Sequence, residues 1–120
     1  MKAKNWLSWI QKSGLYLIIC CLLFLSIVPQ AWAADLENGK KVFEVNCVGC
    51  HVNGGNIIRR GKNLKLKALQ KNGYADVEAI ASIVTNGKAN MSAYKDRLTQ
   101  QEIENVAAYV LAQAEKGWQK

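Results

Sequence analysis

The sequence predicts an all-helical domain over residues 34–120, and three observations support this prediction. Apolar residues recur at spacings of three and four over residues 77–84 and 103–114, as they do on one face of a helix. The only proline in the chain is Pro29, so no proline interrupts a helix in this region. The region also lacks the polar–apolar alternation of half-buried strands. We therefore expect about four helices and no sheet.

Residues 1–33 have the three parts of a secretory signal peptide. A positive start with three lysines is followed by an apolar run over residues 15–28, and Ala31-Trp32-Ala33 offers a small-x-small cleavage pattern. The run is shorter than the roughly 20 residues of a membrane span, although a retained N-terminal anchor is the alternative. No Arg-Arg pair precedes it, which favours the general secretory (Sec) route. We expect a cleaved signal peptide and one exported domain, residues 34–120.

The predicted domain is only moderately basic. The whole chain has 16 basic and 9 acidic residues and a formal net charge of +7. Cleavage would remove three lysines, so 13 basic and 9 acidic residues would remain, with a net charge of +4. The lysine run over residues 62–71 is typical of a solvated helix face, and it also suits docking to an acidic partner. We expect no nucleic-acid binding and no stable membrane insertion after cleavage.

The first predicted helix runs from Leu36 to about Val48. Gly39 lies inside this helix at a cost of about 1 kcal/mol relative to alanine, which indicates close approach of another helix at that point. Simple tolerance of a glycine near a helix start is the alternative. Residues 52–63 follow as a loop that contains Asn53-Gly54-Gly55-Asn56, a typical turn sequence. Ile57 and Ile58 in this loop are candidates for contact with the core or with the ring of a bound cofactor.

Three further helices are predicted from capping residues and apolar spacing. One begins with Asn63 as its cap, and the next with Asp76. The last begins with Thr99, which forms a capping box with Glu102. Each of these helices is expected to end at a glycine, as many helices do, and the three glycines are Gly73, Gly87 and Gly117.

Cys47-Val48-Gly49-Cys50-His51 is a C-x-x-C-H run, the attachment signature of c-type haem. Cys47 and Cys50 can each form a thioether to the porphyrin, and His51 is then placed to donate an imidazole nitrogen to the iron. A zinc site commonly needs a second Cys or His pair, and a thioredoxin-type pair needs a βαβ context. The run therefore predicts one covalent haem c, which is attached on the exported side of a membrane. A non-haem metal-binding or structural module is the alternative.

Met91 is the candidate for the second axial ligand. It is the only methionine in residues 34–120, and it lies 40 positions after His51 in a segment without clear periodicity. Ligation by His and Met suits electron transfer, whereas an open position suits ligand binding or catalysis. An ordinary packing role is the alternative for Met91. With both axial positions filled, the expected function is electron transfer, and the chain is not expected to be an enzyme.

These residues belong to a longer pattern that resembles cytochrome c6, also called soluble cytochrome c553, of cyanobacteria and algal plastids. The resemblance covers essentially all of residues 34–120. It is strongest at Thr85-Asn86-Gly87-Lys88, Met91, Arg97-Leu98 and residues 106–118. It implies the class I cytochrome c fold, which is all-helical, around one covalent haem c. It also implies that Cys47 and Cys50 form the thioethers and that His51 and Met91 are the axial ligands.

The same resemblance implies a photosynthetic role. The family carries electrons in the thylakoid lumen from cytochrome f of the cytochrome b6f complex to photosystem I, and it can also feed a terminal oxidase. Arg97 matches an arginine of the family that is associated with docking to photosystem I; a plain surface charge or a local ion pair is the alternative. We expect a monomer located in the thylakoid lumen or the periplasm.

The sequence departs from the usual family pattern in three places. Met91-Ser92-Ala93-Tyr94 stands where Met-Pro-Ala-Phe is common, and loss of the proline is expected to loosen this loop. Gly55 is expected to affect the reduction potential, and Arg59-Arg60-Gly61 is more basic than usual. These changes suit a c6-like paralogue as well as a main carrier. The alternative function is a haem domain with a labile Met91 that acts in redox or gas sensing or in peroxide chemistry.

Overall fold

The computed structural model describes residues 14–21 and 33–119. The chain divides into two units, residues 1–32 and 33–120, and each is described by itself. In the first unit, residues 14–21 form a helix. The rest of the predicted signal peptide, except Ala33, lies outside the described residues, so its cleavage stays a prediction. Within the described residues, no helix has the length and apolar character that crossing a membrane requires.

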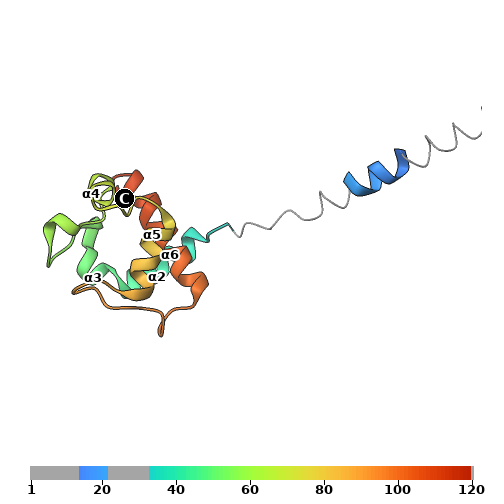
Figure 1. Cartoon of the computed structure of the whole chain (residues 1–120). Coiled ribbons are helices and arrows are strands. Elements are labelled where there is room, and N and C mark those ends of the chain that lie inside the picture. The colour runs from blue at the N-terminus through green and yellow to red at the C-terminus, as the bar shows by residue number, and fades with distance from the viewer. Residues whose placement is uncertain (1–13, 22–32, 120) are drawn as a thin grey trace, which may run out of the picture. The chain divides into compact units, whose positions relative to one another are not determined.

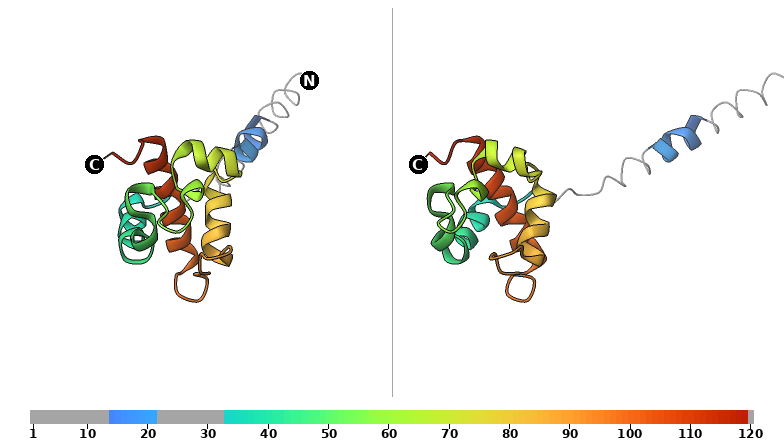
Figure 2. Two further views of the ribbon diagram at one scale, coloured as in Figure 1. Left: turned by 90° about the vertical axis from the view of Figure 1, so that its left-hand side faces the viewer. Right: turned by 60° about the vertical axis from the view of Figure 1, so that its left-hand side comes forward.

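The second unit is helical, as predicted, and its elements are coloured along the chain in Figures 1 and 2. The described residues contain no strand and a single isolated β-bridge, between Lys88 and Met91. The elements of this unit are α2 (Leu36–Asn46), α3 (Val48–His51), η1 (Val52–Gly54), η2 (Arg60–Lys62), α4 (Leu66–Asn72), α5 (Val77–Asn86) and α6 (Gln100–Glu115).

Local sequence signals set most helix ends where they were expected. The Asp76 side chain accepts a hydrogen bond from the backbone N–H of Ala79 at 2.7 Å, and Thr99 and Glu102 form the predicted capping box. Gly73 ends α4 in the left-handed conformation, at φ 75°. The predicted start of α4 is wrong: the helix begins at Leu66 after Lys65, because Asn63 accepts its bond from the N–H of Lys65 in a turn before the helix.

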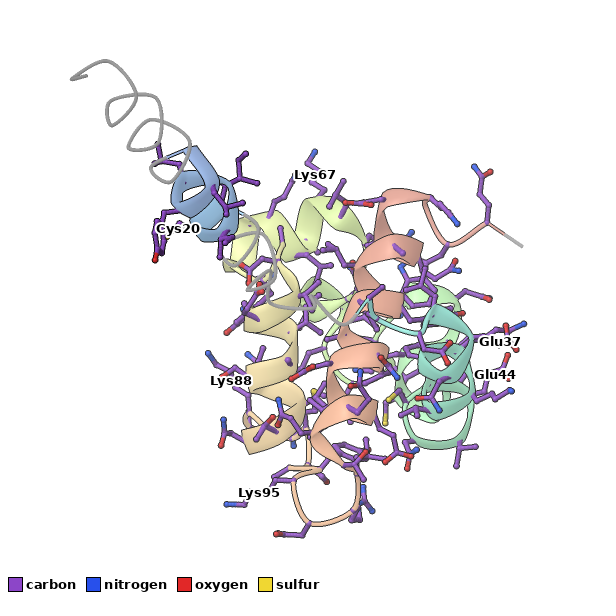
Figure 3. All side chains as sticks on the ribbon, turned by 90° about the vertical axis from the view of Figure 1, so that its right-hand side faces the viewer. Cys20, Glu37, Glu44, Lys67, Lys88 and Lys95 are labelled. Carbon is purple, nitrogen blue, oxygen red and sulfur yellow. The ribbon has the colours of Figure 1, made fainter. Side chains whose placement is uncertain are left out.

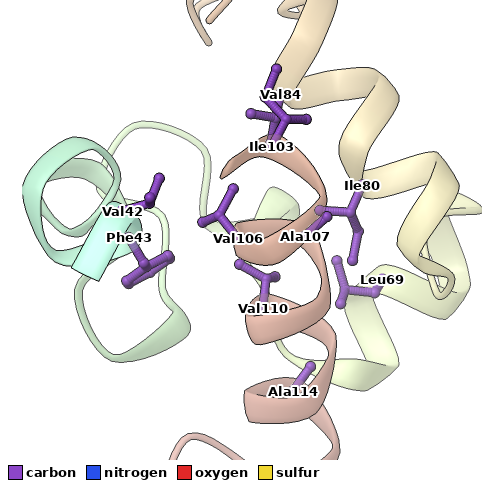
Figure 4. Close-up of a cluster of buried hydrophobic side chains, with 10 residues drawn as sticks. All are labelled: Val42, Phe43, Leu69, Ile80, Val84, Ile103, Val106, Ala107, Val110 and Ala114. Atoms are coloured by element: carbon purple, nitrogen blue, oxygen red, sulfur yellow. The ribbon is translucent and has the colours of Figure 1, made fainter. Parts of the chain in front are cut away.

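Helix α6 is the central element of the fold. It packs against α2 on one side and against α5 on the other, as Figure 2 shows. The predicted apolar stripe of α6 faces these neighbours. With residues from α2, α4 and α5 it forms the core in Figure 4, which consists of Val42, Phe43, Leu69, Ile80, Val84, Ile103, Val106, Ala107, Val110 and Ala114.

The crossing of α2 and α6 depends on Gly39. A Cβ atom at this position would overlap the backbone carbonyl of Asn105 and lie 2.9 Å from the Cβ of Tyr109. The predicted close approach of another helix is therefore confirmed. Next to the crossing, the rings of Phe43, Tyr109 and Trp118 form a cluster with centroid distances of 5.2 to 6.3 Å.

Candidate haem site

The C-x-x-C-H run occupies one helical turn directly after α2. Cys47 joins α2 to α3, and its carbonyl oxygen accepts hydrogen bonds from the N–H groups of Cys50 and His51 at 3.1 and 2.9 Å. Cys47 and His51 are partly buried, whereas Cys50 is exposed. A single turn therefore holds the two thiols and the imidazole in a fixed relationship.

A cavity of about 280 Å³ lies beside this turn, and Cys47, Cys50, His51 and Met91 all line it. These four residues come from two segments 40 positions apart, so the fold brings every predicted site residue to one space. Apolar side chains make much of the remaining wall: Phe43, Leu64, Leu69, Ile80, Ile83, Val84, Val106 and Val110. Two thiols, an imidazole, a thioether and apolar walls form a donor set and surroundings that fit haem c.

The imidazole of His51 is oriented by the backbone. Its Nδ1 lies 2.8 Å from the carbonyl oxygen of Gly55. When Nδ1–H donates to this carbonyl, the lone pair of Nε2 is free to bind a metal, and the hydrogen bond fixes the orientation of the ring. The local chain reversal that brings Gly55 back depends on left-handed backbone at Asn53 (φ 48°) and Gly54 (φ 71°).

Gly54 also fixes this loop against the C-terminal segment. A Cβ atom on Gly54 would overlap the indole ring of Trp118, and the indole N–H of Trp118 donates to the carbonyl of Leu64 at 3.0 Å. The predicted core contact of Ile57 and Ile58 is not found, because their side chains are 69% and 58% exposed. Ile58 lines the cavity, as the predicted contact with a haem ring requires, whereas Ile57 does not. Their exposure places two apolar side chains on the surface of the loop that follows the haem-attachment run.

The Cys47 thiol is held in its neutral form. Burial raises the pKa of this thiol to about 11, with a smaller contribution from the charge of the Cys50 thiolate. Cys47 is therefore protonated at neutral pH in the chain without haem. A neutral, buried thiol is also a poor nucleophile.

Met91 is held by a tight backbone turn. The N–H of Lys88 donates to the carbonyl of Met91, and the N–H of Met91 donates to the carbonyl of Lys88, both at 3.0 Å. Inside the turn, Ala89 adopts a left-handed conformation with φ 53°. The turn lies against Gly87, where an added Cβ would approach the Met91 carbonyl to 2.6 Å. The position of Met91 therefore depends on the end of α5.

Arg97 does not line the cavity, and its side chain is exposed. Its guanidinium carbon lies 4.4 Å from the centroid of the Tyr94 ring, which is a cation–π contact. Tyr94 itself lines the cavity and donates a hydrogen bond to the carbonyl of Asn46 at 3.0 Å. No local sequence pattern marks Tyr94 as part of the site, because its hydrogen-bond partner lies 48 positions away.

Comparisons with known proteins agree with this geometry. A family model described as cytochrome c oxidase, cbb3-type, subunit III matches residues 34–110. A "cytochrome c6-like" protein of Nostoc sp. strain PCC 7120 is 60% identical over 106 residues, which cover 87% of this chain and 96% of that protein. Cytochrome c6 of Thermostichus vulcanus is 47% identical over 106 residues, covering 86% of this chain and 95% of the relative.

The chain belongs to the cytochrome c6 family. Solved structures of the family share its fold. Cytochrome c6C from Synechococcus sp. PCC 7002 is 59% identical in sequence, and its structure matches with a TM-score of 0.65. The match covers 66% of this chain and 96% of the cytochrome c6C chain. Cytochrome c6 from the diatom Phaeodactylum tricornutum is 45% identical with a TM-score of 0.68, and it covers 70% and 99% of the two chains.

Membership of the cytochrome c6 family confirms three predictions. The fold is the class I cytochrome c fold, the cofactor is one covalent haem c, and the similarity to the Nostoc protein supports a c6-like paralogue. The chain is therefore a c-type haem electron carrier, and the alternative of a non-haem metal-binding module is wrong.

Proposed function

We propose that this c6-like cytochrome transfers single electrons in the thylakoid lumen or the periplasm, with Cys47 and Cys50 as thioether residues and His51 and Met91 as axial ligands. The observation that carries the proposal is that the fold places all four side chains on one cavity of about 280 Å³. When bound there, haem c supplies one-electron chemistry between ferrous and ferric iron.

The residues around the cavity would keep the iron ligands in nearly the same geometry in the ferrous and the ferric states. The His51 ring is oriented by its contact with the Gly55 carbonyl, and the backbone of Met91 is held by two hydrogen bonds with the backbone of Lys88. Because both ligands are tied to backbone groups, neither needs to move during the transfer of an electron. The apolar side chains from α4, α5 and α6 exclude water from the inner wall of the cavity. Little rearrangement of ligand or solvent is then needed at each transfer.

We further propose cytochrome f of the cytochrome b6f complex as the electron donor and photosystem I or a terminal oxidase as the acceptor. The family membership and the charge distribution support these partners. No acidic residue lies between Glu44 and Asp76, whereas this interval contains six basic residues, all exposed. In Figure 3, Glu37 and Glu44 lie on α2, while Lys88 and Lys95 lie on the opposite edge of the view. Such a charge distribution orients encounters with an acidic partner.

We propose that residues 1–33 are a cleaved Sec signal peptide and that cleavage leaves a monomeric domain of residues 34–120. Intact mass of the protein purified from an exporting host tests this step. We expect a chain that begins at Ala34 and carries the added mass of one haem. A mass that still includes residues 1–33 would indicate a retained anchor instead.

Visible absorption of the purified holoprotein tests the ligand set. We expect the long-wavelength band that a methionine–iron bond gives to ferric haem, and no spectral change when carbon monoxide is added to the reduced protein. A Met91→Ala variant should lose the band and bind carbon monoxide, and this variant is the matched control for an open site. A wild-type protein that lacks the band and binds carbon monoxide would favour the alternative of sensing or peroxide chemistry.

A further inference from the structure

Tyr94 connects the segment that carries Met91 to the helix that ends at the haem-attachment run. Its hydroxyl donates a hydrogen bond to the backbone carbonyl of Asn46 at 3.0 Å. Asn46 is the last residue of α2 and directly precedes Cys47. Carbonyl groups at the end of a helix lack partners within the helix, so an external donor satisfies one of them here. This bond joins the Met91 segment to the end of α2, next to the haem-attachment run.

The backbone of Tyr94 is also fixed. Its N–H donates to the carbonyl of Val84 in α5 at 2.9 Å, and its own carbonyl accepts from the N–H groups of Arg97 and Leu98, both at 2.9 Å. The ring is partly buried and packs against the core, and the guanidinium of Arg97 covers it at 4.4 Å. Tyr94 therefore lies in one orientation, and its hydroxyl is directed at Asn46.

We propose that Tyr94 is a positioning residue that holds the Met91 segment closed over the cavity through its bond to Asn46. The inference rests on the proposed function, because it takes Met91 as an axial ligand. Met91 lies three positions before Tyr94, between the Lys88 turn and this anchor. If Met91 moves away from the cavity, the exposed residues Ser92 and Ala93 move with it. This movement strains the hydrogen bond between the Tyr94 hydroxyl and the Asn46 carbonyl. The bond to Asn46 therefore adds to the cost of releasing Met91.

Imidazole binding to the ferric holoprotein tests this role, because added imidazole must displace Met91 to reach the iron. We expect Tyr94→Phe, which keeps the ring and removes only the hydroxyl, to keep the methionine band at neutral pH. Its imidazole affinity should rise about five-fold, as the loss of one intramolecular hydrogen bond implies. Tyr109→Phe is the matched control, since Tyr109 packs on Phe43 and Trp118 and does not line the cavity. Its imidazole affinity should equal that of the wild type.

The outcomes separate the two proposals. If the wild type shows the methionine band but Tyr94→Phe binds imidazole no more tightly than Tyr109→Phe, the anchoring role of Tyr94 is wrong and the ligand set stands. If both variants gain affinity equally, the effect is not specific to the bond with Asn46, and the role is again wrong. If the wild type lacks the methionine band, the proposed ligand set fails and the role of Tyr94 fails with it.

Discussion

The side-chain carbonyl oxygen of Asn105 accepts a hydrogen bond from the backbone N–H of Asp35 at 3.0 Å, across 70 positions of sequence. The same oxygen accepts from the side-chain amide of Gln101 at 2.9 Å, and the Asn105 amide nitrogen donates to the Asn38 side chain at 3.0 Å. Asn105 is 3% exposed, and these bonds use both ends of its amide. This buried amide links the start of α2 to α6.

Replacing this amide should destabilise the protein. Asn105→Ala would leave the N–H of Asp35 and the Asn38 side chain without their buried partner, so we expect the free energy of unfolding of the holoprotein to fall by about 2–3 kcal/mol. Urea unfolding followed by circular dichroism measures this change. Asn86→Ala is the control, because Asn86 is exposed and its side chain donates within its own helix to Ser82. Equal stability of the two variants would contradict the prediction.

The α2–α6 crossing should not tolerate a side chain at position 39. In Gly39→Ala the new methyl group would meet the Asn105 carbonyl and the Tyr109 Cβ, so the helices must separate. We expect a loss of about 1–3 kcal/mol in the free energy of unfolding, in the range of overpacked sites. Gly61→Ala is the matched control, since a Cβ at position 61 meets no atom within 4 Å. A Gly39→Ala protein as stable as Gly61→Ala would show that the crossing can adjust.

The turn before Met91 should be improved by glycine. Ala89 has φ 53°, a conformation that costs a residue with a Cβ roughly 1–2 kcal/mol. Ala89→Gly should therefore stabilise the closed turn, and imidazole binding to the ferric holoprotein should weaken severalfold. Ala93→Gly serves as the control, because Ala93 is exposed in the same segment and is not among the residues with positive φ. Tighter imidazole binding by Ala89→Gly would contradict the interpretation.

The capping box of α6 should make stability depend on acid. Hydrogen bonds from the backbone N–H and the hydroxyl of Thr99 lower the pKa of Glu102 from its usual value of 4.5. As the pH falls below 4.5, the unfolded chain takes up this proton before the folded chain does, so stability decreases until the lower folded pKa is passed. Glu102→Gln lacks this titration and should lose less stability between pH 5 and that value. Urea unfolding at a series of pH values measures the difference, and parallel curves for the two proteins would contradict it.

Signals carried by neighbouring residues were predictable from the sequence. The Thr99–Glu102 capping box, the Asp76 cap and the left-handed Gly73 each involve contacts within a few positions, so the local sequence specifies them. The apolar stripe of α6 was equally clear, because a helix repeats its buried face every three to four residues. The two thiols and the imidazole are close together for the same reason, since one helical turn holds all three.

Contacts between distant segments were not predictable from these patterns. One local signal was also ambiguous: α4 begins at Leu66, because the Asn63 side chain accepts a hydrogen bond from Lys65 in a turn before the helix and does not cap the helix itself. The apolar spacing of the first helix groups Leu36 with Gly39, Phe43 and Cys47 on one side, yet Leu36 is 44% exposed, because the buried side is centred on Gly39, Val42 and Phe43. Which side of a short helix is covered depends on the partner helix, and local spacing does not identify that partner.

By itself, the sequence determined the helical class, the haem-attachment run, the identity of the second-ligand candidate and, through resemblance, the family. Only the tertiary structure decided which long-range contacts support the candidate site and the helices around it: the Gly55 carbonyl at His51, the Tyr94 hydroxyl on Asn46 and the Asn105 amide between α2 and α6. The physical reason is that two of these three contacts use a backbone carbonyl as acceptor. Every residue offers such a group, so only the path of the folded chain selects the one that is used.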